Sequence, residues 1–443
     1  MSKNSKNKTI HILGGGPAGM SAAYYAHKNK CDYHIYEASN QVGGNAKTLN
    51  FDNFLIDTGA HRFHDKNDSI TNDIKNLLGE NLKKVSSPSK ICFKDELINF
   101  PIKATDVITK LDSKTSYKII VENILTIFNK NHNPRNFKEL AYNNYGKTLS
   151  NLFLINYTEK LWGELSTNLD VSISGGRLKN LDLYSVIKNL IFNKKESKHI
   201  DGDFLYPKYG FGSIFTTILD NLDHDKISLM TPIKNIIHEN NSIKKIELDN
   251  NNEIDVDHVI STLPLPILIR QLNPPAPKHI LRIVSKIKYR DLKLFILLLD
   301  KESFSPNASL YFPEKEVLFT RIYEPKNRSL YMSPKGKTSI VIEVPCSNEM
   351  KDDNDDTKIY NDIKSFLIDK QFITSDEIIN YKVLSMPFAY PILKSDNNLT
   401  EVFNFIGKIK NINLVGRSAE FKYLHVHDLF NRSKQIIKSI IDN

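Results

Sequence analysis

A glycine-rich turn close to the N-terminus limits most strongly what this chain can fold into. The run Thr9–Leu13 is short, apolar and partly β-branched, which predicts a buried strand. The stretch GGGPAG follows at 14–19, and Met20–His27 has the composition of a helix. Strand, glycine turn and helix in this order are the context that the G-x-G-x-x-G pattern needs for dinucleotide binding. We therefore expect backbone N–H groups and the positive end of the helix dipole to face a pyrophosphate.

An acidic residue stands where such a fold needs one. A second predicted strand, Asp32–Tyr36, ends at Glu37, about 20 residues further on, and this carboxylate is the expected acceptor for the adenosine ribose hydroxyls. A second glycine turn, Gly43-Gly44, follows it and could let the backbone approach the far end of a long dinucleotide. The residues alone are equally consistent with a plain loop, so the choice between FAD and NAD stays open at this point.

The segment that starts at Glu37 resembles the FAD-binding signature of a known group of flavoproteins. Its sequence EASNQVGGN, at 37–45, is similar to the signature shared by amine oxidases, protoporphyrinogen oxidases and UDP-galactopyranose mutases. In most of that group Arg follows the glycine pair, whereas Asn45 is similar to the mutase branch. The resemblance implies that the bound dinucleotide is FAD.

Shorter matches to the UDP-galactopyranose mutases continue along most of the chain. The stretch GAHRFH at 59–64 is similar to that family's G-x-H-x-F-H loop, which lies against the flavin ring. Without the resemblance, His61 and His64 could also be read as a metal pair. We favour a backbone and imidazole wall against a flavin, and we expect no metal site.

Two further matches concern the substrate pocket. The stretch YTEKLWG at 157–163 resembles a mutase segment that borders the nucleotide-sugar pocket, which implies substrate contacts for Tyr157 and Trp162. Trp162 is the only tryptophan, and a lone tryptophan is also a common core anchor. The stretch PFAYP at 387–391 resembles the family's Y-P turn, whose pocket tyrosine would be Tyr390; a bend that places a tyrosine in the core would look the same.

Two arginines match family positions that grip the substrate diphosphate. Arg177, in GGRL at 175–178, matches the family's K-R-x-P segment imperfectly, because Gly replaces Lys and the proline is missing. Arg321, in FTRIYE at 319–324, matches the T-R-I-x-E segment. A guanidinium suits this task because its planar fork donates two parallel hydrogen bonds to phosphate oxygens and keeps its charge. For either arginine alone, a surface ion pair is the alternative.

The C-terminal segment repeats the order of strand, glycine turn and helix. Asn413–Val415 predicts a short strand, Gly416-Arg417 a turn, and Leu429–Ile441 an amphipathic helix. This order again aims backbone amides at a phosphate or at a flavin edge.

The same segment resembles the end of the mutase sequence, with one departure. The stretch GRSAEFKY at 416–423 is similar to the family's G-R-x-x-x-Y-K-Y ending, which closes the FAD site. The family continues with Y-x-D-M, but this chain has His425 where the family has the carboxylate. An imidazole is neutral or cationic, so the departure leaves the sugar and the reaction open.

These segments predict the organisation of the chain. We expect an α/β protein in which a discontinuous, Rossmann-like FAD-binding domain carries a helical insertion and a β-rich substrate domain. The predicted FAD-binding domain comprises 1–80, 203–265 and 385–443, the helical domain 105–200, and the β-rich substrate domain 81–104 and 266–384, where Phe295–Leu299 and Ile340–Val344 are read as alternating strands.

The composition narrows the partners. The net charge of +9 comes from lysines spread among Asn and Asp, and aromatic residues do not interleave with basic clusters, so we expect no nucleic-acid partner. The three cysteines lack a short spacing, which favours a reducing compartment over a disulfide framework. The first residues form no apolar leader, and no apolar run reaches the roughly 18 residues that span a bilayer. We expect a cytoplasmic protein without stable membrane insertion, acting on a small molecule, with a homo-oligomer left open.

The resemblance leaves two functions open. The favoured one is a mutase-like pyranose–furanose isomerase acting on a nucleotide sugar in polysaccharide or glycoconjugate biosynthesis. In that family reduced FAD attacks the anomeric carbon and the nucleoside diphosphate leaves; NAD(P)H is a candidate external reductant. The alternative is an FAD-dependent oxidoreductase of the amine oxidase or protoporphyrinogen oxidase type, which the departures at Arg177 and His425 favour. An inactive FAD-stabilised scaffold is the least favoured, because it would not need the arginines and the histidines together.

The site residues that follow from the glycine pattern and the resemblance fall into three groups. Catalytic roles are expected for Arg177, Arg321, Tyr390, Tyr423 and His425, and substrate contacts for Tyr157 and Trp162. The expected cofactor-binding residues are Gly14, Gly16, Pro17, Ala18, Gly19, Glu37, Ala38, Gly43, Gly44, Asn45, His61, His64, Gly416, Arg417 and Tyr423.

Overall fold

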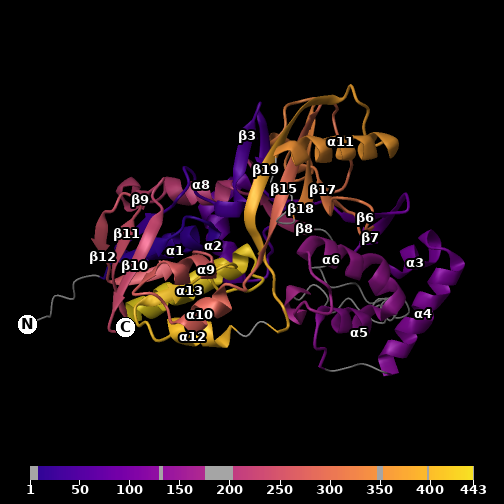
Figure 1. The fold of residues 1–443 in the computed structure, drawn as a ribbon. Coiled ribbons are helices and arrows are strands. Elements are labelled where there is room, and N and C mark those ends of the chain that lie inside the picture. Colours follow the sequence, from indigo (N-terminus) through magenta and orange to yellow (C-terminus); the bar gives the residue numbers. More distant parts are fainter. Residues whose placement is uncertain (1–7, 129–132, 175–202, 347–352, 397–398, 443) are drawn as a thin grey trace, which may run out of the picture.

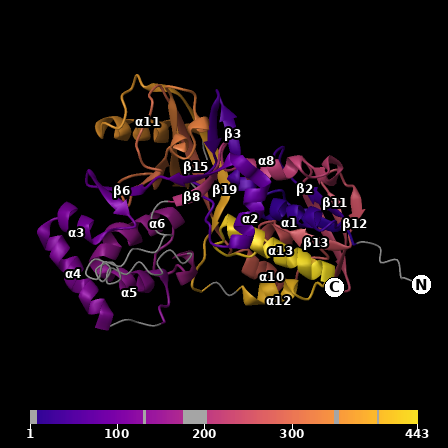
Figure 2. The same ribbon diagram turned by 180° about the vertical axis from the view of Figure 1, so that it is seen from behind.

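The computed structural model describes residues 8–128, 133–174, 203–346, 353–396 and 399–442. A parallel sheet with its helices occupies one end of the molecule, and a group of helices, α3 to α6, occupies the other (Figure 1). The long strands β15 and β19 run between these two parts, and the view from behind shows the same arrangement (Figure 2).

The parallel sheet is built around the first predicted strand. Its order is β20-β13-β1-β2-β9, and every neighbouring pair is parallel. A parallel sheet is covered on both faces, which is why β1 is buried at each of its positions. The predicted strands and helices of this part are found within about three residues of their expected bounds; they are β1 Ile10–Leu13, α1 Pro17–Lys28, β2 Tyr33–Tyr36, β20 Ile412–Leu414 and α13 Val426–Asp442. The strands β9 Ile227–Ser228 and β13 His258–Ser261 complete the sheet.

A second, seven-stranded sheet has the order β19-β15-β18-β17-β16-β6-β7. Its centre pairs β15 in antiparallel register with both β18 and β19. Two segments from early in the chain, β6 and β7, complete one edge through the parallel pairing of β16 with β6. The strands are β6 Ser89–Phe93, β7 Glu96–Phe100, β15 Tyr289–Leu299, β16 Ser309–Tyr311, β17 Arg321–Tyr323, β18 Thr338–Cys346 and β19 Ile378–Pro391. Together the two sheets and their helices confirm the predicted α/β fold class.

The alternating pattern expected for β15 and β18 is wrong. Every residue of β18 is buried, and β15 is buried without interruption from Leu292 onward. Both faces of these strands are covered: α11 (Asp353–Asp369) packs on one face, and the hairpin of β3 (Thr48–Phe51) and β4 (Phe54–Asp57) packs on the other. A strand between two covered faces reads as a continuous apolar run, because neither side meets water.

The helical part contains α3 Ala104–Lys110, α4 Ser113–Phe128, α5 Phe137–Leu149, a π-helical turn at Ser150–Ile155, and α6 Asn156–Trp162. Its side chains share one apolar cluster with the parallel-sheet region, in which Phe137 and Trp162 lie with Ile236 and Leu268. The division of the chain into three domains remains a prediction.

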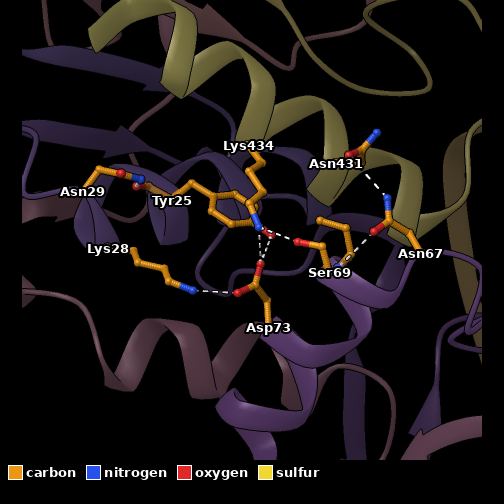
Figure 3. Close-up of polar contacts among 9 residues, drawn as sticks. Tyr25, Lys28, Asn29, Asn67, Ser69, Asp73, Asn431 and Lys434 are labelled. Atoms are coloured by element: carbon orange, nitrogen blue, oxygen red, sulfur yellow. Dashed lines mark hydrogen bonds and ion pairs between the residues drawn. The ribbon is translucent and has the colours of Figure 1, made fainter. Parts of the chain in front are cut away.

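A polar network ties together the helices that carry the site. Asp73 on α2 (Asp68–Leu78) accepts hydrogen bonds from Tyr25 (2.9 Å) and Lys28 (2.6 Å) on α1, and from Lys434 (3.0 Å) on α13 (Figure 3). Lys434 also donates to Ser69 at 2.8 Å. Three helices from distant parts of the chain are thereby fixed relative to one another.

The remaining elements complete the two ends. The strands are β3 Thr48–Phe51, β4 Phe54–Asp57, β5 Leu82–Ser86, β8 Asp203–Pro207, β10 Ile233–Glu239, β11 Ser242–Leu248, β12 Glu253–Asp255 and β14 Leu272–Asn273; the helices are α2 Asp68–Leu78, α8 Ser213–Asp220, α9 Leu265–Arg270, α10 Lys278–Val284 and α12 Thr400–Ile406. Among the described residues, none of the helices combines the length and the apolar character needed to cross a bilayer.

Candidate functional site

The glycine loop lies at the carboxyl end of β1, where the strand passes into α1. A Cβ at Gly19 would collide with the carbonyl oxygen of Gly14, so only glycine lets the helix pack this closely on the turn. At Gly16 the nearest atom to a Cβ would be the Cα of Gly44, at 3.8 Å. The second glycine turn is bound to the first through Gly43 N–H, which donates to the carbonyl of Gly15 at 2.8 Å. The two glycine turns are therefore in direct contact, and we name them together the glycine wall.

The start of α1 has the features of an anion site. Gly16 is the N-cap and provides no side chain to satisfy the first N–H groups, Pro17 opens the helix, and the first turn carries no acidic residue. The N–H groups of Ala18 and Gly19 belong to this first turn. They can bind an anionic ligand, which the positive end of the helix dipole also favours. This bare helix start fits the pyrophosphate of FAD.

Glu37 lies beside the loop, as the sequence predicts. Its Oε2 accepts the N–H of Gly15 at 2.6 Å, and its Oε1 accepts the N–H and the hydroxyl of Ser39 at 2.8 and 2.7 Å. Ala38 lies between Glu37 and Ser39 in the sequence. The carboxylate keeps lone pairs for the ribose hydroxyls of an adenosine, so this arrangement also fits FAD.

His61 belongs to the wall formed by the glycine turns. Its Nε2 donates to the carbonyl of Asn45 at 3.0 Å, because a carbonyl can only accept, and its ring lies 5.2 Å from that of Phe211. Burial lowers the pKa of His61 to about 4, so the ring is neutral at pH 7. The amide of Asn45 donates to the carbonyl of Pro387 at 2.9 Å, which connects this turn to the segment that carries Tyr390.

His64 lies among other imidazoles instead of pairing with His61. Its ring centroid is 5.5 Å from that of His425 and 6.1 Å from that of His427. The described residues contain no group of three His, Cys, Asp or Glu side chains with the arrangement of a metal site. We name His64, His425 and His427 the histidine cluster.

An aromatic group connects the histidine cluster to α6. The Tyr423 ring lies 5.5 Å from His425, 6.0 Å from Trp162 and 6.3 Å from Tyr390. The guanidinium of Arg417 lies over the Tyr423 ring at 4.7 Å and over the Tyr390 ring at 5.7 Å. Trp162 is only 4% exposed, so it is a core anchor as well as a neighbour of these tyrosines.

The turn before Tyr423 lies close to the start of α1. Gly416, which follows β20, has a φ of +132°, a backbone conformation that favours glycine, and a Cβ there would lie 3.5 Å from Ala18 of α1. Arg417 donates twice to the carbonyl of Leu424, at 3.1 and 2.8 Å. The predicted C-terminal closure therefore lies against the start of α1, as expected of residues that would hold FAD.

Arg321 is the centre of a second group of side chains. Its Nε and Nη2 donate to the two oxygens of Glu343 at 3.0 and 2.6 Å, and its guanidinium lies 5.8 Å from the ring of Tyr311. Burial disfavours its charge, but the Glu343 carboxylate and the tyrosines around it hold the pKa of Arg321 well above its ordinary value. Its side chain is 15% exposed, so the pair is not the surface ion pair considered above. The parallel hydrogen bonds expected toward phosphate go to Glu343, and among the described residues Nη1 makes no hydrogen bond that would keep it from a ligand.

The tyrosines predicted for the pocket gather around this arginine. The ring of Tyr157 lies 5.8 Å from that of Tyr311. The charge of Arg321 acts on the hydroxyls of both Tyr157 and Tyr390. Burial, together with Glu343, raises the pKa of Tyr390 to about 12, so its hydroxyl stays protonated and can donate near pH 7. The structure brings Arg321, Tyr157 and Tyr390 together; Arg177 lies outside the described residues.

Sequence reasoning missed the groups that support Arg321. Lys160 of α6 donates to the carbonyls of Phe312 (2.6 Å) and Phe319 (2.9 Å), and also to two carbonyls between them. It thereby holds the loop between Tyr311 and Arg321. The signal for Glu343 was available, since an acidic residue inside an otherwise apolar strand needs a buried partner.

The comparison with protein families decides what kind of protein this is. The profile of the family described as flavin containing amine oxidoreductase matches residues 17–356. The chain belongs to this family. Membership implies FAD as the cofactor, and the glycine wall, the bare start of α1 and Glu37 fit it.

Solved structures resemble the whole chain at low identity. A crystal structure of reduced UDP-galactopyranose mutase has a TM-score of 0.84 at 18% identity, over 98% of this chain and 96% of that one. A putative protoporphyrinogen oxidase from Exiguobacterium sp. 255-15 has a TM-score of 0.75 at 17% identity, over 99% of both chains. These likenesses show the fold that the motifs predicted. Among curated proteins, ferredoxin–NADP reductase 2 of Latilactobacillus sakei is 40% identical over 53 residues, which are 12% of this chain and 16% of that protein.

Proposed function

We propose that this flavoenzyme acts on a nucleotide sugar and interconverts its pyranose and furanose forms with reduced FAD, in polysaccharide or glycoconjugate biosynthesis. The observation that carries the proposal is the group formed by Arg321, Tyr157 and Tyr390. A buried, permanently charged guanidinium among tyrosine hydroxyls is suited to bind a diphosphate. The likeness to a reduced UDP-galactopyranose mutase over nearly the whole chain supports it.

Each part of the site has a task in this proposal. When bound, reduced FAD supplies the electron pair for bond making at the anomeric carbon. Nη1 of Arg321 and the hydroxyls of Tyr157 and Tyr390 bind the diphosphate and stabilise its charge as it leaves. Glu343 fixes the plane of the guanidinium, because it holds Nε and Nη2. Tyr423 offers an aromatic face to the sugar or the base, and the buried Trp162 packs beside it.

The second candidate is an FAD-dependent oxidoreductase that removes a hydride from its substrate, as proteins of the amine oxidase and protoporphyrinogen oxidase type do. The family profile and the putative protoporphyrinogen oxidase neighbour favour it. The two candidates differ in what the substrate needs, since only the first requires a diphosphate. NAD(P)H as the external reductant, a nucleotide sugar as the small-molecule partner, and a cytoplasmic location remain parts of the first proposal.

Substitution of Arg321 tests the diphosphate site. Arg321→Ala should retain the flavin and weaken UDP binding by at least about tenfold, close to 1.4 kcal/mol, because the diphosphate loses its cation. Arg321→Lys should also weaken UDP binding while it keeps a partner for Glu343 and therefore the stability of the sheet. Isothermal titration of UDP into the flavin-loaded protein measures both.

The control is the exposed Arg282 on α10, whose change to Ala should leave UDP binding unaltered. The double variant Arg321→Ala/Glu343→Gln avoids leaving a buried carboxylate unpaired, should the single variant prove unstable. Loss of flavin with unchanged UDP affinity in these variants would show that Arg321 belongs to a different site.

A further inference from the structure

A bulge interrupts β19 close to its C-terminal end. The register of β15 and β19 shifts here, so that residues 387–389 of β19 stand opposite the single residue Asp291 of β15. The central residue of the bulge is Phe388, whose backbone N–H donates to Oδ1 of Asp291 at 2.9 Å. Bulges redirect the side chains of their strand and are common beside active sites. The hydrogen bond to Asp291 holds this one in a defined conformation.

Phe388 has a backbone conformation that a large side chain disfavours. Its φ is +55°, in the left-handed region that glycine and asparagine adopt readily and aromatic residues rarely do. The residue is also 38% exposed, so burial within the protein compensates only in part for this strain. Strained residues persist where the surrounding structure enforces them, and they concentrate at functional sites. The unfavourable backbone therefore presents an aromatic ring at the surface of the protein.

The bulge connects two parts of the candidate site. The carbonyl of Pro387 accepts the side-chain amide of Asn45 at 2.9 Å, which attaches the bulge to the second glycine turn. Tyr390 follows Phe388 two residues later on the same strand, and the charge of Arg321 acts on its hydroxyl. Phe388 thus lies between the turn that we expect at the flavin and the tyrosine that we expect at the diphosphate.

The ring of Phe388 is supported by Tyr289 of β15. The two rings meet edge to face, with their centroids 5.1 Å apart. The hydroxyl of Tyr289 donates to the carbonyl of Ser418 at 2.9 Å, in the turn that closes the predicted FAD site, and Phe421 of the same turn packs on Tyr289 at 5.7 Å. The position of Phe388 is therefore set by the C-terminal turn as well as by Asp291.

We propose that Phe388 determines specificity for the sugar of the nucleotide-sugar substrate, because its ring packs against an apolar face of a hexose. This inference rests on the proposed function. In that reaction the anomeric carbon meets the flavin on one side and the departing diphosphate on the other, so the sugar lies between the two parts of the site that the bulge connects. A hexose ring carries C–H groups on its faces, and their burial against an aromatic ring removes apolar surface from water. UDP alone carries no hexose and makes no such contact.

The test compares UDP-galactose with UDP alone. Both are titrated into the reduced, flavin-loaded wild-type protein and into Phe388→Asn and Phe388→Tyr. Asparagine tolerates a positive φ, so Phe388→Asn removes the ring and keeps the bulge. The affinity for UDP-galactose relative to that for UDP should fall at least about fivefold in Phe388→Asn and should be restored to within about twofold of wild type in Phe388→Tyr. The affinity for UDP itself should not change.

Ile379→Ala is the matched control. Ile379 lies near the other end of β19 and is 45% exposed, so its truncation also removes an exposed apolar side chain from this strand. It should leave both affinities unchanged. Thermal unfolding and the flavin absorbance of each variant report separately on the fold and on the cofactor.

Three results would overturn the inference. A Phe388→Asn protein that keeps its flavin, binds UDP and retains the wild-type ratio of affinities would show that the ring does not touch the sugar, and the proposed function would still stand. Loss of flavin from Phe388→Asn with an unchanged ratio in the loaded fraction would assign the ring to the cofactor instead. Failure of the wild-type protein to bind UDP-galactose would remove the proposed function and the inference with it.

Discussion

At the scale of single residues, glycines with different surroundings do different things in one short loop. Gly19 is needed for packing, since any side chain there meets the backbone of Gly14. A methyl group at Gly16 has room within the protein, since its nearest neighbour would be the Cα of Gly44 at 3.8 Å, so we expect it to obstruct only the approach of a ligand. The two roles predict different outcomes for the same substitution.

Gly16→Ala should fold normally and lose flavin affinity by at least about tenfold, because its methyl group occupies the approach to the pyrophosphate. Gly19→Ala should lose stability as well as flavin, because the helix must move away from the strand. Circular dichroism, thermal unfolding and the flavin absorbance of the purified variants separate these effects. A Gly16→Ala protein that keeps its flavin fully would place the cofactor elsewhere.

Whether a residue of the site could be predicted depends on how far along the chain it lies from the residues that it contacts. Gly14, Gly16, Glu37 and Asn45 could be predicted because the pattern that identifies them is local. The pairing of Arg321 with Glu343, and of His64 with His425, could not, since each contact joins residues that only the tertiary fold brings together. The guanidinium of Arg321 was expected to donate two parallel hydrogen bonds to phosphate oxygens, whereas in the structure it donates them to the carboxylate of Glu343.

At the scale of elements, the site depends on how α6 and α13 are attached. The C-terminal turn of α6 carries Lys160 and Trp162. Burial lowers the pKa of Lys160 to about 8, and its ammonium group donates to the loop before Arg321. The position of this arginine is therefore set by a lysine on a helix of another part of the molecule.

Lys160→Met should retain flavin and lose UDP affinity by about tenfold, because four carbonyls lose their donor and the loop carrying Arg321 loosens. The exposed Lys147→Met on α5 is the matched control and should leave the affinity unchanged. Titration of UDP and limited proteolysis near Phe312–Phe319 measure the two effects. Wild-type UDP affinity in Lys160→Met would show that the loop keeps its position without the hydrogen bonds of Lys160.

Asp73 attaches α13 to α1 and α2 through its hydrogen bonds. Burial alone would raise the pKa of its carboxyl, but hydrogen bonds from Lys28, Lys434 and Tyr25 lower it below the usual value. Asp73→Asn should therefore reduce the free energy of unfolding by about 1–3 kcal/mol near pH 7. The exposed Asp220→Asn should cost less than about 0.5 kcal/mol.

The difference in stability between wild type and Asp73→Asn should depend on pH in a defined way. A carboxyl group whose pKa is lower in the folded state stabilises the fold above its unfolded pKa of about 3.9 and loses this contribution as the pH falls through the folded value. The stability difference between wild type and Asp73→Asn should stay constant from about pH 8 to about pH 5 and shrink below about pH 4. Urea denaturation across this range measures it, and a difference that grows in acid would contradict the assignment.

The elements themselves were predictable to different degrees. The strand–turn–helix units at both ends of the chain were predicted because glycines and apolar periods identify them locally. The strands β15 and β18 were found, but Phe295–Leu299 and Ile340–Val344 were wrongly read as alternating, since a sequence does not show that α11 and the β3–β4 hairpin cover opposite faces. The order of the seven-stranded sheet depends on β6 joining β16, more than 200 residues later in the chain.

At the scale of the whole molecule, the site lies where three kinds of structure meet. The glycine wall and α13 belong to the part that contains the parallel sheet. Arg321 and Tyr390 lie on the seven-stranded sheet, and Tyr157 and Trp162 lie in the helical part (Figure 1). The fold class could be predicted because flavin-binding motifs imply a parallel sheet. The substrate could not, because the residues that would select it come from all three parts.

Turnover by the reduced and the oxidised protein tests the central claim most directly. The purified protein is reduced under anaerobic conditions and incubated with UDP-galactofuranose and a panel of related nucleotide sugars, and the products are separated by chromatography. We predict that the reduced enzyme converts at least one of these sugars to its ring isomer and that the oxidised enzyme does not. A reduced enzyme that converts none, with an oxidised form that consumes oxygen on another substrate, would contradict the account.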